Sequence, residues 1–214
     1  MAEVLLPLRC CFDNPAPTTD KAYTTMPRIP LFPLDVMTDE QRSVLHEIVS
    51  GPRGTIKGPL RAVLHRAELA DRWQRLGEIL RYRTSLPARL SELAILVTAR
   101  AMNAQFEWFA HEPPAREAGI AESVIAALRV GEVPIGLAED EAALHQYCVE
   151  LHRDHSVSDA SYARALEHFG TLGVVELTAL VGYYTMVAMT LNAHQIPLPD
   201  GVEPPLPMVS TDSR

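Results

Sequence analysis

Three side chains in the middle of the sequence have the types and the spacing that acid–base chemistry requires. Glu107 and His111 are four residues apart, so on a helix they share one face and their carboxylate and imidazole can touch. Glu92 lies in a preceding apolar segment, between Leu90 and Leu93, where burial is expected. A buried carboxylate is costly unless it finds a partner or takes up a proton. We therefore predict that Glu92, Glu107 and His111 are catalytic residues that transfer protons near neutral pH.

A structural interpretation of the same three side chains stays open. Glu92 is then a buried carboxylate that bonds His111 or a helix end. Glu107 and His111 are then a pair on a wet helix face, which contributes about 0.3–0.5 kcal/mol. The two interpretations differ in whether the three groups share one enclosed site.

Four further residues are predicted to bind a substrate, namely Arg61, His65, Trp108 and Tyr184. Arg61 and His65 are four residues apart and are expected to hold an anion, with exposure to solvent as the alternative. Trp108 either contacts the substrate or lies in the core. Tyr184 either reaches the substrate or bonds a backbone acceptor from a buried helix.

Proline divides the chain into an extended start, a helical middle and an extended end. Of the 17 prolines, six lie in the first 35 residues and five follow His194. Proline removes a backbone donor and blocks helix interiors. We expect an extended, proline-rich arm over residues 1–35, one helical domain over residues 36–196 and an extended tail over residues 197–214.

The helical domain is predicted to be an all-α bundle of about eight or nine helices, with almost no strand. Caps and apolar periodicity place these helices at residues 39–50, 60–67, 69–82, 88–102, 104–112, 121–130, 139–155, 158–169 and 174–193. Ser85 is expected to cap the fourth helix, and Pro113 with Pro114 to end or kink the fifth. In the third helix the spacing predicts a buried face made by Leu69, Trp73, Leu76, Ile79 and Leu80.

Composition excludes several classes of partner. The formal charge of −8 repels nucleic-acid phosphates, so DNA and RNA are not expected partners. The apolar stretch 172–191 is long enough to span a bilayer, but Glu176 and several polar residues interrupt it, and we expect a buried core helix rather than a membrane segment. Three cysteines, two of them adjacent at Cys10 and Cys11, build no disulfide framework, which indicates the cytoplasm. Extensive apolar faces predict a homo-oligomer.

The sequence resembles the carboxymuconolactone decarboxylase and alkylhydroperoxidase D-like superfamily over residues 26–199. Redox members of that superfamily carry a Glu, then Cys-x-x-Cys, then a His. Aligning Glu92 with the family glutamate puts Ala104 and Glu107 at the two cysteine positions and His111 at the family histidine. Glu107-Trp108-Phe-Ala-His111 is similar to the acidic-Trp-x-x-His motif of a cysteine-free branch. The resemblance implies an all-helical, alkylhydroperoxidase D-like and usually oligomeric fold.

The missing thiols make peroxide reduction unexpected, because neither alanine nor glutamate can attack or resolve a peroxide. Acid–base chemistry on a small organic acid or lactone is the leading hypothesis, as decarboxylation, isomerisation or hydration, without a cofactor. Arg61 is expected to hold the carboxylate of an anionic substrate. One alternative is a lyase or hydrolase in which Glu92, Glu107 and His111 bind a divalent metal. Another is a non-catalytic helical oligomer that binds a ligand.

Overall fold

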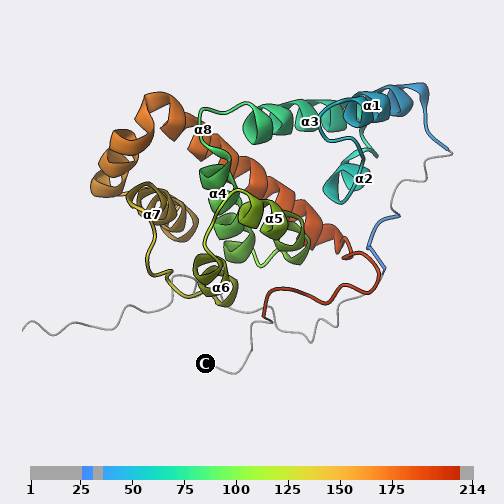
Figure 1. Ribbon diagram of the computed structural model, residues 1–214. Coiled ribbons are helices and arrows are strands. Elements are labelled where there is room, and N and C mark those ends of the chain that lie inside the picture. Colours follow the sequence, from blue (N-terminus) through green and yellow to red (C-terminus); the bar gives the residue numbers. More distant parts are fainter. Residues whose placement is uncertain (1–25, 31–35, 208–214) are drawn as a thin grey trace, which may run out of the picture.

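The computed structural model describes residues 26–30 and 36–207. In this part of the chain the regular structure is eight helices and no strand (Figure 1), which confirms the predicted all-α class. The helices are α1 (Asp39–Ser50), α2 (Pro59–Val63), α3 (Ala67–Tyr82), α4 (Ala88–Ala101), α5 (Gln105–Glu117), α6 (Glu122–Val130), α7 (Glu139–Asp154) and α8 (Asp159–His194). Most of the predicted N-terminal arm, with Cys10 and Cys11, and the end of the predicted tail lie outside the described residues.

Helix α4 forms the centre of the molecule. Its residues from Leu90 to Ala99 are all buried, including the polar Ser91, Glu92 and Thr98. Helices α5, α6, α7 and α8 pack around it (Figure 1). The predicted cap at Ser85 is wrong, because α4 begins after Pro87 and Ser85 instead donates its hydroxyl to Glu176 of α8. Glu92 is therefore carried by the most deeply buried helix of the fold.

Helix α5 continues through its two prolines, so the alternative in which it ends at Pro113 and Pro114 is wrong. It reaches Glu117, and the amide of Ala118 still bonds the Pro114 carbonyl at 2.8 Å. Pro113 is exposed. The part of the helix where proline removes a backbone N–H donor therefore lies toward solvent rather than in the core. The helix that bears Glu107 is consequently longer than its sequence indicated.

The buried face of α3 also differs from the prediction. Small residues such as Ala70 and Gly77 face the core together with Trp73, whereas Leu69 and Ile79 are about half exposed, at 50% and 46%. Small side chains let α3 approach its neighbours closely, and this packing overrides the apolar periodicity. Trp73 and Leu80 are buried as predicted, whereas Leu69, Leu76 and Ile79 are left largely on the surface.

Helix α8 contains the two C-terminal helices predicted separately. They meet at Gly170, whose φ of 63° and ψ of 177° break the helical path at a residue that tolerates positive φ. By length and composition alone α8 could cross a membrane, and half of its most apolar window is buried. A core helix meets the same criteria, so they are weak evidence for a span. The part of α8 beyond the break carries Tyr184.

We predict that the exposed apolar side chains of α3 are covered by a second copy of the chain. Leu69, Leu76 and Ile79 lie on one side of this helix and are each 45–50% exposed. Light scattering at micromolar concentration should therefore give a mass that is a multiple of 23.6 kDa. A mass near 23.6 kDa would contradict the prediction.

Candidate active site

The structure brings Glu92, Glu107 and His111 together in one buried cluster. The Nδ1 atom of His111 lies 2.6 Å from Glu92 Oε2, and its Nε2 atom lies 3.0 Å from Glu107 Oε1. The side chains of His111, Glu92 and Glu107 are only 3%, 11% and 5% exposed. The three side chains thus lie together as predicted. The alternative, in which Glu107 and His111 form a pair on a wet helix face, does not fit this burial. We call these three side chains the triad.

A tight turn between α4 and α5 positions the triad. Asn103 adopts a left-handed conformation, with φ of 48°, which asparagine tolerates better than most residues. The amide of Ala104 then bonds the Ala99 carbonyl at 2.8 Å, and the Ala104 side chain is completely buried. The methyl group of Ala104, at one of the family's cysteine positions, lets the start of α5 lie directly against α4. Glu107 and His111 follow one and two turns later on the face toward Glu92.

The triad favours a protonated His111. Burial favours the neutral imidazole, but the contacts with Glu107 and Glu92 outweigh it and raise the pKa of His111 above its ordinary value. With both nitrogens protonated, the ring donates one N–H to Glu92 and directs the other at Glu107. The Tyr184 ring packs edge-on against the imidazole, with centroids 5.1 Å apart. This arrangement holds a mobile proton between two carboxylates.

This pKa shift predicts how stability depends on pH. A histidine whose pKa is higher in the folded than in the unfolded chain stabilises the fold fully below about pH 6.5, the unfolded value. That stabilisation is lost as pH rises through the folded pKa, by about 1.4 kcal/mol per pH unit within the window. We expect urea denaturation to show this decline above about pH 6.5. The decline should vanish in His111→Gln and persist in His46→Gln, which alters an exposed histidine. An unchanged slope in His111→Gln would contradict the assignment.

The geometry does not favour the metal-binding alternative. Glu92 and Glu107 contact opposite nitrogens of the His111 ring, so the two carboxylates and the imidazole do not converge on one point. Among the described residues, no group of three His, Cys, Asp or Glu side chains is placed to hold a metal ion. The donors are arranged for sharing protons.

The residues predicted to bind substrate lie in three different environments. Tyr184 is buried against His111, and burial followed by the charge of Glu107 raises the pKa of its hydroxyl, which stays protonated. Trp108 is completely buried in the core on the adjacent face of α5, and its indole N–H donates to Glu112. The structure therefore brings Tyr184 to the triad, whereas Trp108 has the structural role that was its alternative.

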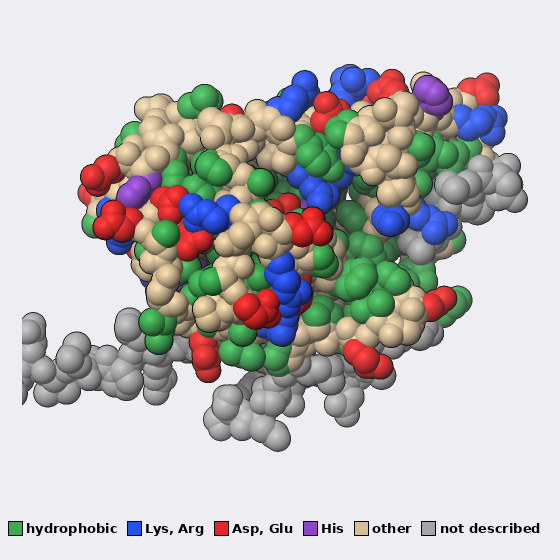
Figure 2. Space-filling view, viewed as in Figure 1, with side chains coloured by type: hydrophobic (Ala, Val, Ile, Leu, Met, Phe, Trp, Pro, Cys, Tyr) green, Lys and Arg blue, Asp and Glu red, His purple; other side chains and the backbone are tan. Residues whose placement is uncertain are grey.

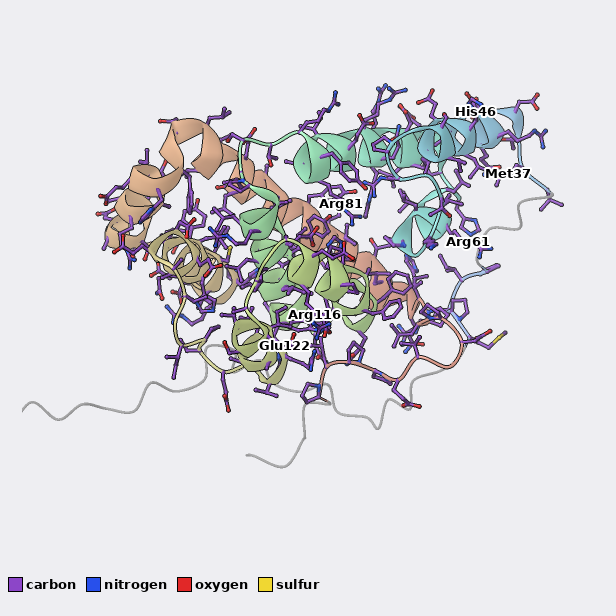
Figure 3. The ribbon with its side chains drawn as sticks, in the orientation of Figure 1. Met37, His46, Arg61, Arg81, Arg116 and Glu122 are labelled. Carbon is purple, nitrogen blue, oxygen red and sulfur yellow. The ribbon has the colours of Figure 1, made fainter. Side chains whose placement is uncertain are left out.

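Arg61 lies on α2 (Figure 3), and His65 follows shortly after the end of that helix. His65 is exposed, and its Nε2 is 2.9 Å from the Pro30 carbonyl oxygen. It also lines a cavity of about 180 Å³ between α2, α3 and α8, together with Trp73 and His194. No contact of Arg61 or His65 with Glu92, Glu107 or His111 is present in the described part of the chain. The expected role of Arg61 as holder of the substrate carboxylate has no geometric support.

Two arginines that were not among the predicted site residues lie near the triad or its neighbouring tyrosines. Arg81 of α3 is within electrostatic range of Glu92, Glu107 and Tyr184, and Figure 3 shows it between α3 and the central helices. Arg53 lies 3.5 Å from the hydroxyl of Tyr183, the neighbour of Tyr184. The sequence feature that could have pointed to these arginines is Gly77, a glycine inside an otherwise regular helix and one turn before Arg81.

Cys148 lies on a different helix from the triad residues, and its surroundings make its thiol unreactive. It lies on α7, is completely buried, and burial raises the pKa of its thiol far above the ordinary value. A protonated, enclosed thiol is a poor nucleophile. Among the described residues, no thiol is placed at the triad.

Comparison with solved structures identifies the fold. The chain superposes on an uncharacterized peroxidase-related protein from Ralstonia eutropha JMP134, an alkylhydroperoxidase AhpD core, with a TM-score of 0.69 and 16% identity over 83% of this chain and 94% of that one. A peroxidase-related protein from Silicibacter sp. TM1040 gives 0.66 and 14%, covering 81% and 92%. The debrominase Bmp8 gives 0.62 and 10%, covering 76% and 87%. The fold is therefore alkylhydroperoxidase D-like.

The sequence match agrees with this fold. Residues 67–154 match the model of the carboxymuconolactone decarboxylase family, and this segment contains the whole triad and Arg81. This segment of the chain is thus similar to the carboxymuconolactone decarboxylase family. No curated protein matches the chain significantly.

Proposed function

We propose that the protein is a thiol-independent enzyme that transfers protons to and from carbon in a small organic acid or lactone. Decarboxylation, isomerisation and hydration all need this step. The proposal rests on one observation, the buried imidazole of His111 between the carboxylates of Glu92 and Glu107. Positioned acids and bases of this kind contribute about 10²–10⁴-fold to a rate.

The roles of the triad follow from its hydrogen bonds. Glu92 accepts the Nδ1–H of His111 and so fixes the ring, which makes it a positioning residue. His111 exchanges its Nε2 proton with Oε1 of Glu107. In the described part of the chain no hydrogen bond engages the second oxygen of Glu107, which leaves that atom for the substrate. Glu107 accepts a proton from substrate carbon on its second oxygen, while the His111 imidazolium keeps its Nε2 proton. Where CO2 is lost instead, Glu107 relays the Nε2 proton of His111 to the carbanion equivalent, and water reprotonates His111.

We also propose that the protein belongs to the cysteine-free branch of its family. Alanine and glutamate occupy the cysteine positions, and the buried Cys148 offers no substitute. The charge of −8 supports a small-molecule substrate rather than nucleic acid. We further propose a cytoplasmic location and no membrane partner, on the cysteine usage and on the interrupted apolar stretch of α8.

Solvent deuterium tests the proposed function. The protein is incubated in D2O with a panel of small carboxylic acids and lactones, and NMR follows deuterium on carbon. We expect at least one member to gain deuterium, or to give a product carrying it, and Glu107→Gln to abolish the incorporation. A panel without any incorporation would favour the non-catalytic, ligand-binding alternative.

Thiol chemistry is predicted to be absent. Replacing Cys10, Cys11 and Cys148 by serine should leave any proton-transfer activity within a few-fold, because none of these thiols takes part. Turnover of an organic hydroperoxide with a dithiol donor, measured by peroxide consumption, should stay at the rate without protein. Peroxide turnover that is lost in Cys148→Ser would refute this prediction.

A further inference from the structure

A second polar cluster adjoins the triad around Gly77 on α3. A β-carbon at Gly77 would lie 2.1 Å from the Tyr183 hydroxyl oxygen and 2.4 Å from Arg53 Nη2. The absence of a side chain therefore admits both groups to the surface of α3. Arg81 lies one turn further along the same helix face. The Arg53 guanidinium and the Tyr183 hydroxyl thus lie beside the helix at Gly77, with Arg81 on its next turn.

The guanidinium group of Arg53 is incompletely satisfied. Arg53 Nε is buried without a hydrogen-bond partner. In residues 26–30 and 36–207, the only polar or ring contact of the Arg81 guanidinium within bonding range is the Tyr82 ring, 5.4 Å from its Cζ. Buried donors without partners are costly, and in native structures such groups usually await water or a ligand.

Charge balance favours a single negative charge at this place. The triad carries two carboxylates and one imidazolium, and Arg53 and Arg81 add two positive charges. These five groups together carry a formal charge of +1. Burial opposes a charged Arg81, but the fields of Tyr184, Glu92 and Glu107 raise its pKa, so it stays charged. Figure 2 shows basic side chains in a hollow beneath the upper helices, with acidic side chains beside them.

We propose that Arg53 and Arg81, with the Tyr183 hydroxyl, form an anion subsite that holds one carboxylate of the substrate. Guanidinium groups match carboxylates in shape and bind them through paired N–H donors. The Tyr183 hydroxyl stays protonated, because burial raises its pKa to about 12, and it adds a neutral donor. The proposal rests on the proposed function and narrows its substrates to small monocarboxylates, with the reacting carbon placed toward Glu107.

Benzoate tests the subsite without any turnover, with benzamide as the neutral molecule of the same shape. In isothermal titration calorimetry we expect benzoate to bind the full-length protein with a dissociation constant on the order of 1 mM or below, and benzamide to bind far more weakly. Arg81→Gln and Arg53→Gln should each weaken benzoate binding about ten- to hundredfold. Arg72→Gln, at an exposed arginine of the same helix, should leave it unchanged.

Two further variants keep the test decisive. Gly77→Ala should also weaken benzoate binding, because its methyl group displaces Tyr183 and Arg53. Glu107→Gln should retain or tighten it, because a neighbouring negative charge is removed. Equal binding of benzoate and benzamide, or normal benzoate binding in both Arg81→Gln and Arg53→Gln, would overturn the subsite. Deuterium incorporation into a neutral lactone without benzoate binding would overturn the subsite and leave the proton-transfer function intact.

Discussion

Glu107→Gln is expected to lower kcat by about 10²–10⁴-fold on any substrate that gains solvent deuterium. The amide keeps the size of the carboxylate and can still contact His111 Nε2, but it cannot accept a proton from carbon. Because the loss falls on the chemical step, kcat should fall while KM changes little. Steady-state kinetics followed by NMR or by CO2 release measure both constants.

Two variants control this experiment. Glu117→Gln alters an exposed glutamate at the end of the same helix and should leave kcat unchanged. Glu92→Gln tests the positioning role, since it should lower kcat less than Glu107→Gln and shift the pH profile of kcat toward lower pH. Full activity in Glu107→Gln would exclude Glu107 as the proton acceptor.

His111→Ala is expected to destabilise the fold by about 3–5 kcal/mol at neutral pH. The substitution removes the cation between two buried carboxylates and leaves Glu92 and Glu107 facing each other without compensation. Urea denaturation measures the change in the free energy of unfolding. The exposed His46→Ala is the matched control and should change this free energy by less than about 0.5 kcal/mol.

Neutralising the carboxylates should reverse most of this loss. When all partners of a buried ionic group are replaced together, the net change is often small. His111→Ala combined with Glu92→Gln and Glu107→Gln should therefore be more stable than His111→Ala alone. If the triple variant is no more stable, the destabilisation comes from the lost packing against Tyr184 and not from charge.

Local sequence signals were sufficient for the class of the fold and for most of its helices. Caps, prolines and the long apolar runs identified α4 and α8 as helices. The buried face of α3 could not be derived, because small residues such as Ala70 and Gly77 join Trp73 and Leu80 on it in place of Leu69, Leu76 and Ile79, and only the tertiary packing decides between them. The passage of α5 through Pro113 and Pro114 depends likewise on where the freed carbonyls point in the assembled fold.

The triad was predictable and the arginines beside it were not. Glu107 and His111 lie at helical spacing, and the family resemblance identified Glu92 as their partner from the preceding helix. Arg53 and Arg81 come from a loop and from another helix, and no short-range spacing connects them to the triad. Arg61 was chosen because it lies four residues before His65 on a predicted helix, but the segment before that helix contributes Arg53 instead.

The protonation state of His111 is best measured by ¹⁵N NMR of protein labelled at its histidines, titrated from about pH 5 to pH 10 around the ordinary histidine pKa. We expect both ring nitrogens of His111 to carry protons at pH 7, and the titration midpoint to lie above the ordinary value of about 6.5. In Glu107→Gln the midpoint should move down, because one of the two carboxylates that hold the proton is lost. A His111 ring that is neutral at pH 7, or a midpoint that Glu107→Gln leaves unchanged, would contradict a proton shared between Glu92, His111 and Glu107.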